Sequence, residues 1–286
     1  MPKTSSASIM EKFGENSSPS VFTFKYAGRE PLTTAELLLQ RPELTDLYVY
    51  DICLTTGSLL YSCAGGIGIT KEPFIVDMHR FIKTSTCVHA LKSFFKADFG
   101  NYYTRRKYYM ARERFNELGL VGGLSSAESA RLYLLWSGGG FKHRYRGRGY
   151  DALYAPTSID YEGLAQTSRL SREKNLLFRR EDLSTFSEGI INDNVFVHMY
   201  LPSEFGVYGA GFKWNEREME KYVRVVRELG SFGYKVCVSG LFERRGKIFR
   251  DYRELFPEFD HLVLPGFKVS ELTFEPKFSE IHLFNF

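Results

Sequence analysis

The segment 47–58 limits most strongly what this chain can fold into. Residues 47–53 form an apolar run of buried-strand type, which leads directly into a turn containing Gly57 and then into an apolar helical run. A second apolar run, residues 73–77, ends on the carboxylate of Asp77. Strand, glycine-containing turn, helix and strand is the order of the nucleotide-binding half of a Rossmann-like sheet. We therefore predict an α/β fold.

Further patterns extend this predicted sheet toward the C-terminus. Residues 195–197 favour a short buried strand that stops at 199–202 and opens into a loop. We also expect strands at 235–239, 261–264 and 280–284, the last two as an antiparallel hairpin that closes the sheet, and helices at 128–136, 215–229 and 248–256. Residues 79–118 are expected to be largely helical, and 161–190 to be a connecting helix and loop.

The composition of the chain favours a globular protein over a membrane protein or a metal-binding one. The 286 residues are 43% hydrophobic and 25% charged, as in an ordinary globular chain, and no apolar run has the roughly 18 residues of a membrane span. The four cysteines lack metal-ligand spacing and favour reduced core residues. These features predict an intracellular protein, in the cytoplasm or nucleus, with no metal site and no membrane partner.

One stretch combines positive charge with aromatic rings. Residues 141–150 alternate basic residues with aromatics and glycines, as in a hairpin that lies against a phosphate backbone. The candidate nucleic-acid contacts in this stretch are Lys142, Arg144, Tyr145, Arg146 and Arg148. A solvated surface loop is the alternative. The many aromatics, 25 Phe and 18 Tyr, have the same two interpretations, as core residues or as surface rings that stack on bases.

Several of these segments, in this order, resemble the DNA adenine-N6 methyltransferases of the Dam type. The family motif Lys-Trp-Ala-Gly-Gly-Lys is similar to residues 25–30, and its cofactor loop Pro-Phe-x-Gly-x-Gly-Ser to residues 52–58. The family's Asp-Ile-Asn is similar to residues 77–79, and its Arg-Tyr-x-x-Arg-Gly to residues 144–149. Two positions differ in character, because Glu30 replaces a lysine and Thr55 replaces a glycine.

The resemblance implies a Rossmann-like S-adenosylmethionine-dependent methyltransferase fold with an inserted, mainly helical DNA-recognition domain. It divides the chain after residue 20 into an α/β domain of residues 21–80 and 185–286 and an insertion at 81–184, whereas composition alone predicts a flexible segment at 1–20. The cofactor-binding candidates that it implies are Lys25, Tyr26, Ala27, Gly28, Asp51, Gly57, Ser58 and Asp77. From spacing alone, Asp77 has a second interpretation as a helix cap.

The catalytic motif is where the chain departs most from the family. The family uses Asp-Pro-Pro-Tyr after a short apolar strand, with the Asp accepting from the target amino group and the Tyr stacking on the flipped adenine. Here the corresponding residues are Met199, Tyr200, Leu201 and Pro202, preceded by His198. Methionine cannot ionise and cannot replace a carboxylate as acceptor.

Three hypotheses follow from this pattern. The first is a catalytically inactive relative that binds nucleic acid, DNA rather than RNA, or a protein partner, such as the active methyltransferase subunit of a heterodimer. The second is an active adenine-N6 methyltransferase with a divergent site, which binds S-adenosylmethionine and uses His198 or Tyr200. The third is a structural protein that reuses the fold, with its cofactor cleft filled by Tyr26, Met78 or Phe74.

Overall fold

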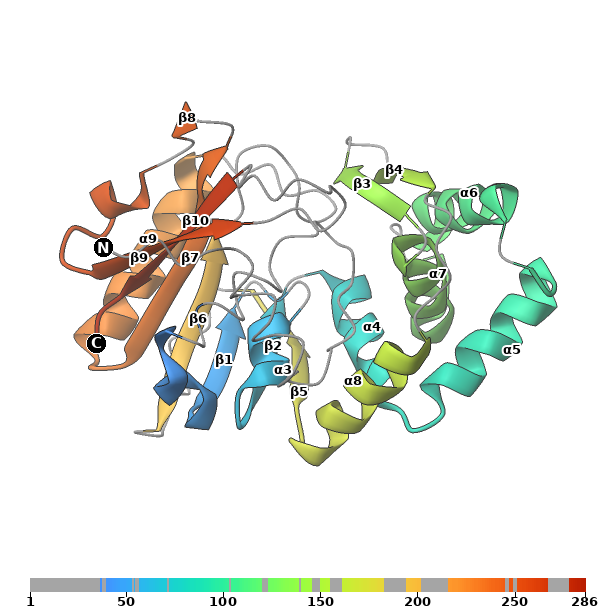
Figure 1. Ribbon diagram of the computed structural model, residues 1–286, viewed down its shortest axis with the longest axis horizontal. Helices are drawn as coiled ribbons and strands as arrows, with labels where there is room; N and C mark the ends of the chain where they lie inside the picture. The colour runs from blue at the N-terminus through green and yellow to red at the C-terminus, as the bar shows by residue number, and fades with distance from the viewer. Residues whose placement is uncertain are drawn as a thin grey trace, which may run out of the picture.

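A mostly parallel β-sheet is the centre of the computed structural model (Figure 1). The structure describes residues 37, 40–52, 54, 57–70, 72–102, 104–119, 123–138, 140–145, 150–154, 161–182, 194–201, 216–244, 247–248, 251–266 and 278–286. Within them the chain is an α/β protein, as predicted, and no helix in this part is both long and apolar enough to cross a membrane.

The order of the strands is that of a Rossmann-like sheet. The strands are β1 (Tyr48–Ile52), β2 (Gly65–Thr70), β5 (Leu177–Arg180), β6 (Val195–Leu201), β7 (Lys235–Arg244), β8 (Lys247–Ile248), β9 (Asp260–Gly266) and β10 (Phe278–Phe284). They lie in the order β5-β2-β1-β6-β7-β10-β9, with β8 paired to β7. Neighbours from β5 to β7 are parallel, whereas β10 is antiparallel to β7 and β9. The predicted C-terminal antiparallel hairpin is therefore confirmed.

The sheet grows in two directions from its centre. After β1 the chain adds β2 and β5 on one side, and it then adds β6 and β7 on the other. The direction therefore changes between β1 and β6, which are parallel neighbours. In open α/β sheets, ligands bind outside the carboxyl ends of the two strands at this switch point.

Helices cover both faces of the sheet. They are α3 (Ser58–Ser62), α4 (Pro73–Lys83), α5 (Cys87–Phe99), α6 (Arg105–Arg114), α7 (Ser126–Gly138), α8 (Tyr161–Glu173) and α9 (Glu216–Ser231), with short 3-10 turns at Pro42–Asp46 and Tyr252–Glu254 and a π-helical turn at Phe115–Gly119. α9 covers one face, where Val226 and Leu229 pack with Val197 and Met199 of β6. The other face packs against α3 and a core that continues through α4 to α8.

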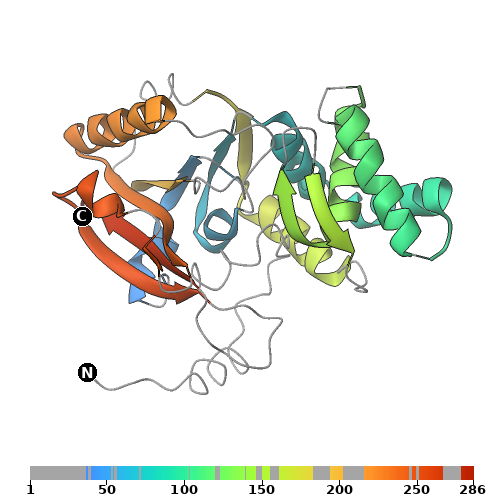
Figure 2. The same cartoon turned by 90° about the horizontal axis from the view of Figure 1, so that it is seen from above.

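The helices that follow α4 form a second group beside the sheet. α6 and α7 lie next to the two-stranded hairpin of β3 (Gly140–Tyr145) and β4 (Tyr150–Tyr154), on the far side of α4 from β6, and α5 lies beyond them, farther from the hairpin (Figures 1 and 2). The aromatic residues Phe74, Phe115 and Tyr133 form a buried contact between α4 and this group. The predicted hairpin and the helices predicted at 128–136 and 215–229 are present.

The second strand of the sheet lies earlier than predicted. Residues 73–77 do not form a strand, because they begin α4, with Pro73 in the first helical turn and Phe74, Met78 and Ile82 buried at helical spacing. The strand is the glycine-rich β2 instead. A Cβ at Gly66 would overlap the carbonyl oxygen of Val49, so β1 and β2 approach closely only because this side chain is missing.

Two further expectations need correction. The strand predicted at 195–197 continues through Leu201, because residues 199–201 pair with β7 and alternate between two buried faces. The helix predicted at 248–256 is reduced to the 3-10 turn at Tyr252–Glu254, since β8 takes its beginning.

Candidate functional site: a buried polar chain at the switch point

Two polar side chains meet where the sheet changes direction. Asp51 of β1 and His198 of β6 are opposite each other in the parallel register. The Oδ1 atom of Asp51 lies 3.0 Å from Nδ1 of His198. Both side chains belong to the face that packs against α3, because Val49 and Phe196, two residues earlier on each strand, are in that apolar cluster. The pair therefore lies at the position where a Rossmann-like sheet receives its ligand.

The contact continues across two more strands. Nε2 of His198 lies 3.0 Å from the hydroxyl of Ser239 on β7, and the same hydroxyl lies 2.8 Å from Nδ1 of His282 on β10. Asp51, His198, Ser239 and His282 are 5%, 8%, 1% and 3% exposed. A row of four buried polar side chains thus crosses four adjacent strands, and we refer to it as the Asp51–His282 chain.

With a neutral His198, hydrogen-bond rules assign one direction to the Asp51–His282 chain. The carboxylate of Asp51 can only accept, so Nδ1 of His198 donates and Nε2 of a neutral His198 accepts from the Ser239 hydroxyl. Ser239 then accepts from Nδ1 of His282. Nε2 of His282 is then unprotonated and can only accept, and this atom has no hydrogen-bond partner in the described part of the chain. A buried acceptor without a partner costs less than a buried N–H without one.

Burial keeps the far end of this chain neutral. It lowers the pKa of the His282 imidazole to about 3, and the adjacent His198 lowers it further. A neutral His282 is what the assigned direction requires, since a protonated ring would place a second, unpartnered N–H in the interior.

The first three residues of the Asp51–His282 chain have the contacts of a Ser-His-Asp triad, but the serine is not accessible to a substrate. In such a triad the serine hydroxyl attacks a substrate while the histidine takes its proton. Ser239 lies within β7 rather than at a strand end, it is 1% exposed, and its oxygen already accepts from His282. The arrangement therefore joins four strands by hydrogen bonds and offers no open nucleophile. Nor do the described residues contain a group of His, Cys, Asp and Glu placed to hold a metal ion.

The predicted cofactor residues do not all come together. Gly57 has φ +71 and precedes α3, so the turn after β1 uses the left-handed backbone that favours glycine, and Ser58 begins the helix. Asp77 lies inside α4 rather than at a strand end. The acid that follows β2 is Glu72, which precedes α4. The candidates Lys25, Tyr26, Ala27 and Gly28 lie outside the described residues, as do Glu30 and Thr55.

The degenerate motif does not form a loop. Met199 and Leu201 are buried in the cluster that packs against α9, whereas Tyr200 belongs to the cluster on the opposite face. All three pair with β7, and Pro202 lies outside the described residues. Of the residues that would fill a cleft, Phe74 and Met78 are buried in the helical core. His198, which directly precedes the motif, makes a polar contact with Asp51 at the switch point.

The nucleic-acid candidates are placed only as backbone. Lys142, Arg144 and Tyr145 are on β3, and Tyr145 pairs with Tyr150 of β4 at the end of the hairpin ladder. Arg146 and Arg148 fall in the connection 146–149, which lies outside the described residues.

Sequence reasoning missed Ser239, His282 and Glu72. The sequence contains one signal for Ser239 and His282, because each is a polar residue between apolar neighbours in a predicted strand. The pattern does not show that they share a row, since the order of strands decides which residues become neighbours.

Comparison with known proteins adds no family to this description. No protein-family model matches the chain, and no curated protein matches it. What the fold defines is an α/β protein with a mostly parallel, Rossmann-like sheet.

Proposed function

We propose that this protein is a catalytically inactive relative of the Dam-type adenine methyltransferases that binds nucleic acid or a protein partner. The observation that carries the proposal is the 3.0 Å contact between Asp51 and His198 at the switch point. In the family resemblance, Asp51 belongs to the cofactor site and the end of β6 to the catalytic site. In this chain, Asp51 is hydrogen-bonded to His198, which lies in β6 directly before the degenerate catalytic motif.

The sheet supports the methyltransferase part of this proposal. Counted along the chain, its long strands lie in the order 3-2-1-4-5-7-6, and the reversed strand β10 is inserted between β7 and β9. A simple doubly wound dinucleotide-binding sheet has the order 3-2-1-4-5-6, with parallel strands. The inserted reversed strand is the arrangement expected of the S-adenosylmethionine-dependent methyltransferase fold that the motifs resemble.

The residues fit the cofactor only in part. The left-handed Gly57 turn suits a backbone that approaches a nucleotide. Asp51, however, gives its Oδ1 to His198 within the sheet, and Asp77 lies in α4 away from a strand end. Because the Asp51 side chain is 5% exposed and its Oδ1 already accepts from His198, little of this carboxylate is open to a cofactor, and the Asp51–His198 contact opposes cofactor binding.

The catalytic part of the family site is also missing. The family reaction needs a carboxylate and carbonyl acceptors for the target amino group. Met199 and Leu201 present thioether and alkyl groups, and both are fully buried in β6. The proposal therefore assigns binding, without methyl transfer, to this protein. An active methyltransferase subunit is the protein partner that the resemblance suggests.

Duplex DNA binding tests the nucleic-acid part of the proposal. We expect a short labelled duplex to bind with an affinity that falls as salt rises, because basic side chains displace counterions from the phosphates. Arg144→Gln, on β3, is expected to reduce the slope of log affinity against log salt by about 1. Fluorescence anisotropy across a salt series measures both quantities.

The matched control for Arg144 is Arg169→Gln. Arg169 is an exposed arginine of α8 whose nearest acid, Glu173, is 3.7 Å away, so its removal is expected to leave the salt slope unchanged. Absence of duplex binding, or an affinity that does not respond to salt, would contradict this part of the proposal.

A further inference from the structure

The turn between α5 and α6 presents the most exposed of the large hydrophobic side chains that the structure describes. α5 ends at Phe99, and Gly100 turns the chain with φ +78. Tyr102 follows with 78% of its surface exposed, and Thr104 then caps α6. We refer to Tyr102 and the basic residues around it, Lys96, Arg105, Arg106 and Lys107, as the Tyr102 corner.

The backbone of the Tyr102 corner is held in place from below. The ammonium of Lys107 donates to the carbonyl oxygen of Tyr102 at 2.7 Å and lies 5.9 Å from the centre of the Phe95 ring. Phe95 and Phe99 are buried and stacked on each other beneath the turn. The ring of Tyr102 is therefore presented to solvent from a fixed backbone, which lowers the entropy lost when a ligand packs on it.

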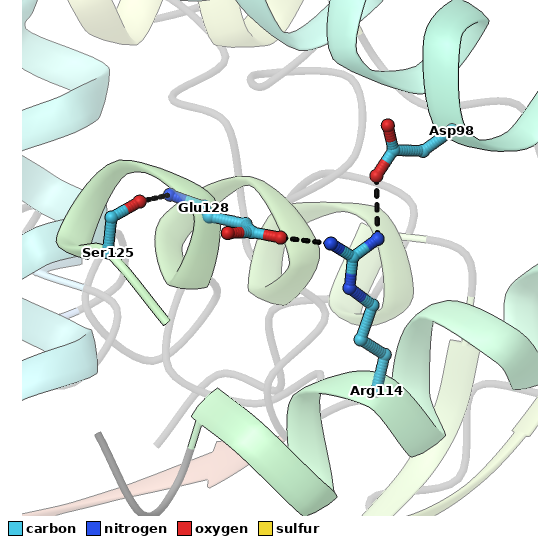
Figure 3. A network of polar contacts seen from close by, with 4 residues as sticks. All are labelled: Asp98, Arg114, Ser125 and Glu128. Carbon is cyan, nitrogen blue, oxygen red and sulfur yellow. Dashed lines mark hydrogen bonds and ion pairs between the residues drawn. The ribbon is translucent and has the colours of Figure 1, made fainter. Parts of the chain in front are cut away.

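The charge of the Tyr102 corner is positive. Lys96, Arg105 and Arg106 are exposed, and the acids nearest to them in sequence are Asp98 and Glu113. Asp98 is bound by Arg114 of α6 at 2.6 Å, and the same guanidinium contacts Glu128 of α7 (Figure 3). These acids are paired with other arginines, because Asp98 and Glu128 share Arg114 and Glu113 lies 3.8 Å from Arg112, so they do not neutralise the corner. The exposed cations remain available for an anionic ligand.

We propose that the Tyr102 corner binds an unpaired stretch of nucleic acid, with a base stacked on Tyr102 and phosphates on Arg105 and Arg106. This inference rests on the proposed nucleic-acid function, but it adds a second contact remote from the hairpin residues and names the form of nucleic acid. An exposed ring beside cations is the combination that single-stranded nucleic acid uses, since each base has a stacking face. Duplex DNA hides its base faces in the helix, and an acidic peptide has none.

The position of the α5–α6 turn also suits this role. α6 packs beside β4 of the basic hairpin and extends from it toward the outer edge of the molecule (Figure 1). A duplex at the hairpin with a frayed or single-stranded continuation along α6 would therefore reach the Tyr102 corner.

Anisotropy with a labelled oligothymidylate and a duplex of the same length tests this inference. Tyr102→Ala is expected to weaken oligothymidylate binding by about tenfold or more, because base–aromatic stacking contributes roughly 1–3 kcal/mol per base. Tyr102→Phe, which keeps the ring, is expected to bind like the unaltered protein. The double variant Arg105→Gln, Arg106→Gln is expected to reduce the salt slope by about 0.7 per charge removed.

The matched control is Phe232→Ala, because Phe232 is an aromatic residue with 61% exposure at the end of α9. It is expected to leave oligothymidylate binding unchanged. An unchanged affinity in Tyr102→Ala, an equal loss in Phe232→Ala, or equal affinity for polyglutamate would overturn the inference. If duplex binding through Arg144 persists in any of these cases, the proposed function stands and only the Tyr102 corner is wrong.

Discussion

Replacing His198 by alanine is expected to lower the free energy of unfolding by about 3–5 kcal/mol. The substitution leaves the 5% exposed carboxylate of Asp51 without its partner and removes the acceptor of the Ser239 hydroxyl. Removing one member of a buried, hydrogen-bonded pair costs more than the pair contributes, because the remaining group stays desolvated. Urea unfolding monitored by circular dichroism measures the change.

Two comparisons isolate the contribution of the Asp51–His198 pair. His89→Ala, at an exposed position of α5, is expected to change stability by no more than about 0.5 kcal/mol. The double variant Asp51→Ala, His198→Ala is expected to cost less than the sum of the two single variants, by about 0.5–3 kcal/mol. Simple additivity would show that the two side chains do not depend on each other.

Lowering the pH below about 6.5 is expected to destabilise the protein through His282. The pKa of the folded-state imidazole is about 3, below its ordinary value, because the ring is buried and adjoins His198. The unfolded state therefore binds one more proton between these two pH values. The stability that comes from a neutral His282 is complete above the unfolded pKa and is lost as the pH falls, by about 1.4 kcal/mol per pH unit.

The variant His282→Asn separates this effect from the titration of carboxylates. It is expected to have a shallower dependence of unfolding free energy on pH between about 6 and 4 than the unaltered protein, whatever its absolute stability. His89→Gln serves as the control and is expected to keep the original dependence. Identical slopes in His282→Asn and the unaltered protein would mean that His282 is not a buried neutral histidine.

The sequence predicts the elements whose patterns depend on their own residues. The apolar runs at β1, β7 and β10 and the amphipathic pattern of α9 identify those elements. The sequence does not predict the strand β2, because three glycines among its six residues suggest a turn. Gly66 is needed for the close approach of β1, and this approach is a property of the assembled sheet. Residues 74–76 of α4 are all apolar, and a short apolar run is typical of a buried strand as well as of a buried helix. The pattern alone therefore predicts a strand where the structure has a helix.

The sequence predicts only local parts of the site. Its strand and turn patterns predict a glycine turn after the first strand, and the structure has Gly57 in the turn that follows β1, the strand that carries Asp51. The other three members of the Asp51–His282 chain come from β6, β7 and β10, and each is more than a hundred residues from Asp51 in the sequence. Hydrogen bonds between such distant residues depend on strand order and register, which single-sequence patterns do not specify. His198 was therefore noted beside the degenerate motif, but its contact with Asp51 was not foreseen.

Calorimetric titration with S-adenosylmethionine and S-adenosylhomocysteine tests the central claim most directly, which is that Asp51 is committed to His198 and the switch point takes no cofactor. The protein is first shown to be folded by a cooperative thermal transition. We expect no heat of binding from either compound. Saturable binding in the micromolar range would contradict the account, and it would favour the alternative that this protein is an active methyltransferase with a divergent site.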